Sequence, residues 1–157
     1  MPSLVTSYFA ESGKFGDTST LSTPAFTPSN GELIVVKATT WDTGTPSGTP
    51  SGGSLTYTQK ATAAPGGFNG YATIFTAPVS GSPGSMTITL SAPAGSCYHA
   101  MVVERWTNAQ VAASPATSSP LVGVHSQPSA TLTTTAGNSI ITWAMVDAFC
   151  PMATYMQ

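Results

Sequence analysis

The chain has 157 residues and carries four lysines and arginines and six aspartates and glutamates, so charged residues make up only 6% of it, against about 25% in an average globular domain. Four scattered basic residues cannot neutralise a run of phosphates, which excludes nucleic acid as a partner, and 41% hydrophobic residues suffice for a packed core. No apolar run approaches the ~20 residues that span a bilayer, and the length predicts one domain over residues 1–157.

Three strands are predicted in the first quarter of the chain. Residues 3–10 can form the first, and residues 21–27 the second, which Pro24 confines to an edge or a strand start because proline donates no ladder hydrogen bond. Residues 31–41 begin with a turn glycine, continue through four apolar residues rich in β-branching and end on Trp41. This pattern is typical of a strand covered on both faces, so we expect residues 31–41 in the centre of a sheet.

Residues 43–54 form a long stretch of glycine, threonine, proline and serine with a doubled Gly-Thr-Pro-Ser unit. Loops of this length in compact domains are either functional or lack a fixed structure. We interpret this stretch as a mobile connector on the surface. Because loop closure depends only weakly on length, we predict that it can be shortened without loss of the fold.

The remaining strands are short and are separated by glycine, proline and serine. They are expected at residues 55–60, 71–76, 86–90, 96–106, 130–135 and 139–146. No segment carries a convincing helix pattern. Eight or nine short strands at this spacing predict an all-β fold, an antiparallel β-sandwich that is jelly-roll-like, with a barrel as the alternative.

The stretch 86–90 gives the clearest strand signal. Apolar and threonine side chains alternate strictly, with Met86, Ile88 and Leu90 on one face. A slip of one residue would invert the whole set. We therefore predict that the three apolar side chains are buried and that the two threonines are exposed.

No catalytic motif is found in the chain. Gly13-Lys14 lacks the earlier glycine of a phosphate-binding loop, because Tyr8 occupies that position. A glycosidase pair needs only two carboxylates about 5–10 Å apart, but Asp17, Glu32 and Asp42 stand at turns or strand ends, where we interpret them as solvated. We therefore expect no enzymatic activity and no cofactor.

Two cysteines and two histidines are too few for a convincing metal site. Cys97 and His99 share one face of their strand, and only Cys150 or His125 could complete the three or four ligands that zinc requires, so we expect no bound metal. The start of the chain has neither the basic nor the apolar region of a secretory signal. This predicts synthesis in a reducing cytoplasm and no disulfide between the two cysteines.

Several polar and aromatic side chains are expected to act in packing. Glu104 and Arg105 are adjacent in a strand and point to opposite faces, so we expect a cross-strand partner for at least one of them. The large aromatics are interpreted as anchors of the core or of an interface, with a sugar-stacking platform as the alternative. They are Trp41, Trp106, Trp143, Tyr57, Tyr71 and Tyr98.

An ordered set of short runs resembles a β-sandwich family of virion proteins from tailed phages that infect actinobacteria. The runs, which span residues 20–147, are Gly31-x-Leu-Ile-Val-Val with Trp41-Asp42, Leu55-Thr-Tyr-Thr, Ile74-Phe-Thr-Ala-Pro78, Met86-Thr-Ile-Thr and Val102-Val-Glu-Arg-Trp106. The resemblance implies a structural protein of the virion, assembled in the host cytoplasm, with no enzymatic residues to carry over. A capsid decoration protein is the first expectation and a minor tail protein the alternative.

Assembly is expected to cover apolar residues near the end of the sequence. Members of that family continue with further strands beyond the one that matches residues 140–146, so we expect this sandwich to leave apolar and strand-edge surface that another chain covers. With few charges to keep copies apart, a homo-oligomer in contact with the major capsid protein or tail proteins is expected. A carbohydrate-binding module for host-surface glycan is the alternative from another class of function. The candidate interaction residues are Phe149, Met152, Tyr155 and Met156.

Overall fold

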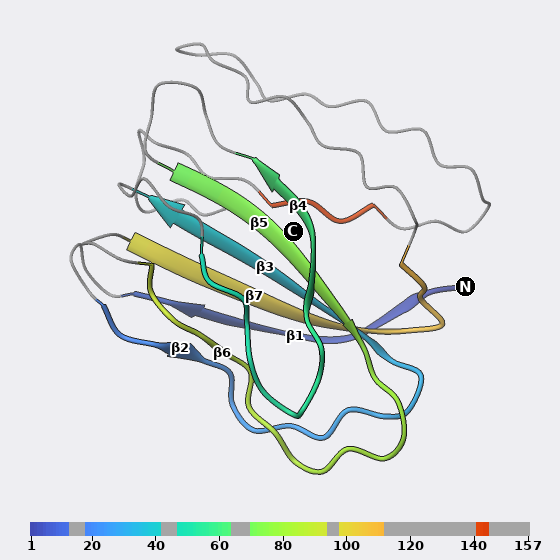
Figure 1. Cartoon of the computed structure of the whole chain (residues 1–157). Coiled ribbons are helices and arrows are strands. Elements are labelled where there is room, and N and C mark those ends of the chain that lie inside the picture. The colour runs from blue at the N-terminus through green and yellow to red at the C-terminus, as the bar shows by residue number, and fades with distance from the viewer. Residues whose placement is uncertain (13–17, 42–46, 64–69, 94–97, 112–140, 145–157) are drawn as a thin grey trace.

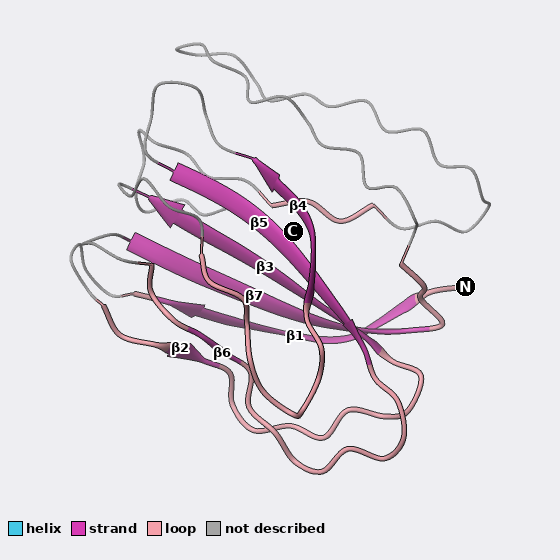
Figure 2. Ribbon diagram, in the orientation of Figure 1, coloured by secondary structure: helices cyan, strands magenta, loops and turns pink. Residues whose placement is uncertain are grey.

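The computed structural model describes residues 1–12, 18–41, 47–63, 70–93, 98–111 and 141–144. This part of the chain contains seven strands and no helix: β1 (Ser3–Glu11), β2 (Leu21–Ser22), β3 (Leu33–Trp41), β4 (Thr58–Ala63), β5 (Gly70–Pro78), β6 (Thr89–Leu90) and β7 (Tyr98–Thr107). Five of them form an antiparallel sheet in the order β1-β7-β3-β5-β4, and β2 pairs with β6 (Figure 1, Figure 2). The predicted all-β, sandwich-like fold is thus confirmed.

The strand β3 is the centre of the large sheet. All nine of its residues pair with β5 on one side and with β7 on the other, and the first eight, from Leu33 to Thr40, are buried. Both faces of this strand are therefore covered, as the apolar and β-branched run predicted. β1, β5 and β7 likewise occupy the places predicted for strands 3–10, 71–76 and 96–106.

Other predicted strands differ from the structure in extent. β4 begins at Thr58 rather than at residue 55, because Leu55 packs on the core and Tyr57 is buried in it before the chain joins the sheet. The predicted strand 21–27 is reduced to β2 and an isolated bridge at Phe26, on either side of Pro24. Residues 130–135 lie outside the described residues. The prediction for 139–146 is wrong for residues 141–144, which form no strand and alternate between exposed and half-buried instead of facing a core.

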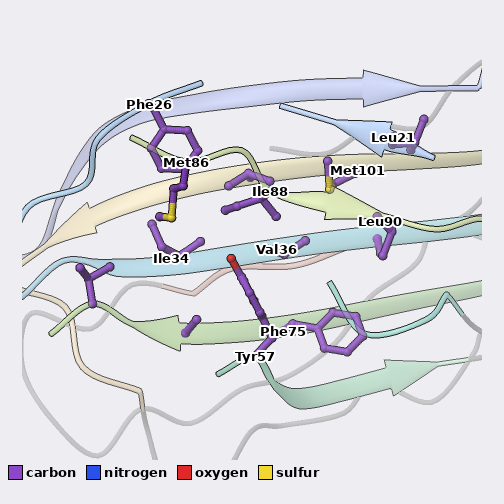
Figure 3. Packing of buried hydrophobic residues seen from close by; sticks show 14 residues of the cluster. Leu21, Phe26, Ile34, Val36, Tyr57, Phe75, Met86, Ile88, Leu90 and Met101 are labelled. Atoms are coloured by element: carbon purple, nitrogen blue, oxygen red, sulfur yellow. The ribbon is translucent and has the colours of Figure 1, made fainter. Parts of the chain in front are cut away.

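The hydrophobic core lies between one face of the large sheet and a layer built from residues 21–26, 51–57 and 86–90 (Figure 3). From this layer Met86, Ile88 and Leu90 point into the core, whereas Thr87 is exposed and Thr89 half-buried. The predicted parity of this stretch is confirmed. The buried residues of the core are Leu21, Phe26, Ile34, Val36, Ala38, Tyr57, Phe75, Ala77, Val79, Met86, Ile88, Leu90, Met101 and Val103.

The segment before β4 is part of this covering layer and not a free connector. Ser51 and Thr89 exchange two backbone hydrogen bonds of 3.0 and 2.8 Å, and Ser47 and Pro50 are buried. The chain comes so close to its neighbour at Gly52 that a Cβ atom there would lie 2.0 Å from the Thr87 carbonyl oxygen. The predicted free connector is therefore wrong for residues 47–54, because glycine lets two backbones approach and pack. The predicted surface position is correct for Gly48, Thr49, Ser51 and Ser54, which are exposed. Residues 42–46 lie outside the described residues.

Tyr57 reaches into the core from this layer and gives the fold a pH dependence. Burial raises the pKa of its hydroxyl to about 12, from about 10 in an unfolded chain. The unfolded state therefore loses its proton first, and the stability conferred by the neutral phenol is complete below pH ~10 and is lost as the pH rises towards ~12. We expect Tyr57→Phe to lose less stability than the wild type between about pH 9 and 11.5.

Urea denaturation midpoints of both proteins, measured at neutral pH and at the two alkaline values, test this expectation. The neutral measurement is the control, since it gives the cost of losing the 3.3 Å hydrogen bond from the Tyr57 hydroxyl to the Gly52 carbonyl. Parallel alkaline losses in the two proteins would contradict a role for Tyr57.

Candidate assembly surface

Within the part of the chain that the structure describes, β1 forms an open edge of the large sheet. It pairs with β7 on one side, and no strand in the described part of the chain pairs with its other side (Figure 1). Leu4, Val5 and Phe9 are 47%, 46% and 54% exposed. An edge strand of nine residues presents a row of unpaired backbone groups, and here apolar side chains accompany them. We call Leu4, Val5 and Phe9, together with the open side of β1, the β1 edge.

A bulge brings two of these side chains to the same face of the sheet. Leu4 lies opposite Trp106 and Phe9 opposite Val102, and the register shifts between Leu4 and Thr6. Without the shift, residues five positions apart would point to opposite faces. The β1 edge therefore presents both Leu4 and Phe9 on the face away from the core, with Ser7 between them.

The opposite edge of the sheet, β4, has features that oppose pairing with another chain. It has six residues, contains Lys60 and has its own bulge between Gln59 and Ala61. Short length, a lysine and a bulge are devices by which natural proteins protect an edge. Between the two edges of the large sheet, β1 is thus the one suited to association.

Next to the β1 edge, an ionic cluster closes one end of the core. The Arg105 guanidinium donates two hydrogen bonds, of 2.8 and 2.9 Å, to the two carboxylate oxygens of Glu32. It lies 5.2 Å from the centre of the Phe26 ring, which stacks on Tyr8 of β1 at 4.9 Å. The hydrogen bonds with Glu32 raise the pKa of Arg105, against the opposing effect of burial. Glu32 is only 4% exposed, so its interpretation as a solvated carboxylate is wrong.

A second buried ion pair lies on the other face of the sheet. Lys37 in the middle of β3 donates to Glu104 of β7 at 2.5 Å, and the side chains are 1% and 9% exposed. The indole nitrogen of Trp106 donates to the other carboxylate oxygen at 3.1 Å. Glu104 and Arg105 therefore both have ionic partners across the sheet, on opposite faces, as predicted for at least one of them. These groups fix the register of β3 and β7.

The residues considered for other chemistry are mostly separated or engaged in packing. His99 is buried, with Nε2 2.9 Å from the Ser19 carbonyl oxygen. The described residues include no group of three or more side chains that could hold a metal ion. Among the aromatics, Tyr57 is in the core, whereas Trp41 and Tyr98 lie half-buried with ring centres 5.9 Å apart. The remaining ligand and interaction residues lie outside the described residues, namely Cys97, His125, Phe149, Cys150, Met152, Tyr155 and Met156.

Sequence reasoning missed the β1 edge, although a signal is present. In residues 3–10, apolar side chains occur at both even and odd positions, so one set must point away from the core. The same stretch contains no proline and no charged residue. Apolar residues on both faces of a strand indicate either a central strand or an unprotected edge.

Comparisons with protein-family models, with curated proteins and with solved structures find no match. The described residues contain no helix with the length and apolar character needed to cross a membrane.

Proposed function

We propose that this protein is a structural subunit of a tailed-phage virion, a decoration protein seated on the capsid, and that it self-associates through the β1 edge. The observation that carries the proposal is the exposure of Leu4, Val5 and Phe9 along an unprotected edge strand. The assignment to a virion rests on the ordered runs that resemble virion proteins of tailed phages. A chain with few surface charges has little repulsion between copies, which suits subunits held at high local concentration.

A second copy of the chain fits the β1 edge better than a charged partner does. Two β1 strands can run antiparallel with the symmetry axis at Ser7, which lies opposite Glu104, midway between the partners of Leu4 and Phe9 on β7. Leu4 of each copy then lies opposite Phe9 of the other. The two copies of Glu11, the single charged residue of the strand, then lie at opposite ends of the paired strands. The same surface is thus apolar and self-complementary, and its pairing satisfies the open backbone groups of both copies.

The expected result is that Phe9→Lys weakens self-association at least about tenfold, because a lysine desolvated without a partner costs more than ~1.4 kcal/mol. Sedimentation velocity at micromolar concentration measures the association. Ile141→Lys is the matched control, since Ile141 is also 54% exposed but lies outside β1. Circular dichroism confirms that both variants are folded. A monomeric wild type, or equal weakening by both substitutions, would count against the β1 edge.

The location on the particle is tested separately. An electron-microscopy map of the intact virion is expected to contain the density of this sandwich on the capsid. Density in the tail would instead establish the minor tail protein, and absence from the particle would overturn the virion proposal even if the β1 edge pairs.

A carbohydrate-binding module is the second candidate function, favoured by the contact between Trp41 and Tyr98. Two half-buried rings at one end of the large sheet can stack on a sugar. Binding to host cell-wall glycan that is lost in Trp41→Ala, by a protein absent from virions, would support this candidate over the first.

A further inference from the structure

Apart from the assembly surface, the most unusual buried group in the described residues is His99. This residue is 2% exposed, and its backbone N–H and C=O form hydrogen bonds of 3.0 and 2.8 Å with the hydroxyl and the N–H of Ser12. Its ring nitrogen Nε2 lies 2.9 Å from the Ser19 carbonyl oxygen. One histidine therefore fastens both Ser12 and Ser19, which follow β1 in the chain, to β7.

The contact with Ser19 determines which ring nitrogen carries the proton. A carbonyl oxygen can only accept, so Nε2 must donate and must hold the hydrogen. In the neutral imidazole, Nδ1 is then a bare acceptor. This Nδ1 is buried, and the described residues offer it no hydrogen-bond partner.

A second buried polar atom without a hydrogen-bond partner among the described residues lies on the neighbouring strand, directly opposite His99. Thr40 of β3 is directly opposite His99 of β7, is 1% exposed, and its hydroxyl oxygen Oγ1 is also buried without a partner among the described residues. Directly opposite residues in an antiparallel pair point to the same face with their Cβ atoms about 4.5–5.5 Å apart. Two buried polar atoms that lack partners on adjacent strands are rare in a native fold.

We infer that Thr40 and His99 hold one buried water molecule, which donates a hydrogen bond to Nδ1 and shares another with the threonine hydroxyl. Water fits because it offers two donors and two acceptors to a site with one bare acceptor and one hydroxyl. The described residues provide no further ligands here for a metal ion. The bound water would complete the hydrogen bonds of the histidine that fastens Ser12 and Ser19 to β7.

The direction in which Thr40→Val changes the Tm distinguishes a site that holds a water molecule from an empty site. If the water is bound, Thr40→Val removes one of its anchors, and the Tm of the full chain is expected to fall by about 2–4 °C. If the hydroxyl has no partner, valine relieves an unpaired buried group and the Tm rises. Thr73→Val is the reference for a direct hydrogen bond, since its hydroxyl lies 3.0 Å from that of Thr62.

A high-resolution crystal structure of the wild type identifies the bound species. The expected result is an isolated density peak within hydrogen-bond distance of both Nδ1 and Oγ1, without anomalous signal. A rise in Tm, a direct bond between Thr40 and His99 with no peak between them, or an anomalous metal peak would each overturn the inference. Ring nitrogen NMR shifts check the protonation in solution, and a proton on Nδ1 instead of Nε2 would also overturn it.

Discussion

Replacing Lys37 by methionine is expected to lower the free energy of unfolding by about 3–5 kcal/mol, the cost of removing one partner from a buried ion pair. Lys37 and Glu104 are both shielded from solvent in the wild type. Without the ammonium group, the carboxylate retains the indole N–H of Trp106 as a donor, but its charge is no longer compensated. Urea denaturation followed by tryptophan fluorescence measures the loss.

Two further variants distinguish the ion pair from a general effect of losing a lysine. Lys60→Met, on the edge strand β4, is expected to change stability by no more than about 0.5 kcal/mol. The double variant Lys37→Met/Glu104→Leu is expected to recover most of the loss, because apolar residues of similar volume replace a buried pair with little cost. If the double variant is no more stable than Lys37→Met, an uncompensated Glu104 is not the cause.

Gly52→Ala is expected to destabilise the fold by about 2–4 kcal/mol, through backbone strain together with overpacking. Gly52 has a φ of +136°, a region that side-chain-bearing residues rarely enter, and its added Cβ atom would lie 2.0 Å from the Thr87 carbonyl oxygen. Backbone cannot move aside as a flexible side chain can. The substitution therefore separates the segment at Gly52 from the stretch that carries Ile88 into the core.

Gly48→Ala is the matched control, four residues earlier in the same stretch. A Cβ atom at Gly48 meets nothing within 4 Å, so the change is expected to be neutral or stabilising by up to about 1 kcal/mol through the unfolded state. Thermal unfolding of both variants makes the comparison. Equal, small effects would show that residues 47–54 do act as the free connector that their composition suggests.

The sequence predicted those parts of the fold that depend on local periodicity. The strict alternation around Ile88 placed its stretch on the core, and the β-branched run 31–41 placed β3 in the centre of the sheet. The first pattern indicates one apolar face and the second indicates two, and in each case the apolar faces are the ones that the fold buries.

What could not be predicted depends on partners distant in the sequence. Glu32 stands after a turn and was interpreted as solvated, but its partner Arg105 is 73 residues away and becomes a neighbour only through the pairing of β3 with β7. Lys37 and Glu104 are 67 residues apart. The β1 edge was missed for a related reason, since which strand ends a sheet is decided by strand order and not by the strand itself.

The order β1-β7-β3 also has a consequence for how the chain is made. β1 leaves the ribosome before the other described strands, yet its partner among them, β7, ends at Thr107, so a nascent chain cannot complete this pairing until Thr107 has been synthesised. β3, β5 and β4 can pair earlier, which leaves one side of β3 open until β7 arrives. Contacts of such long sequence separation slow folding. During that interval the apolar strands β1 and β3 are both exposed to chaperones and to other nascent copies.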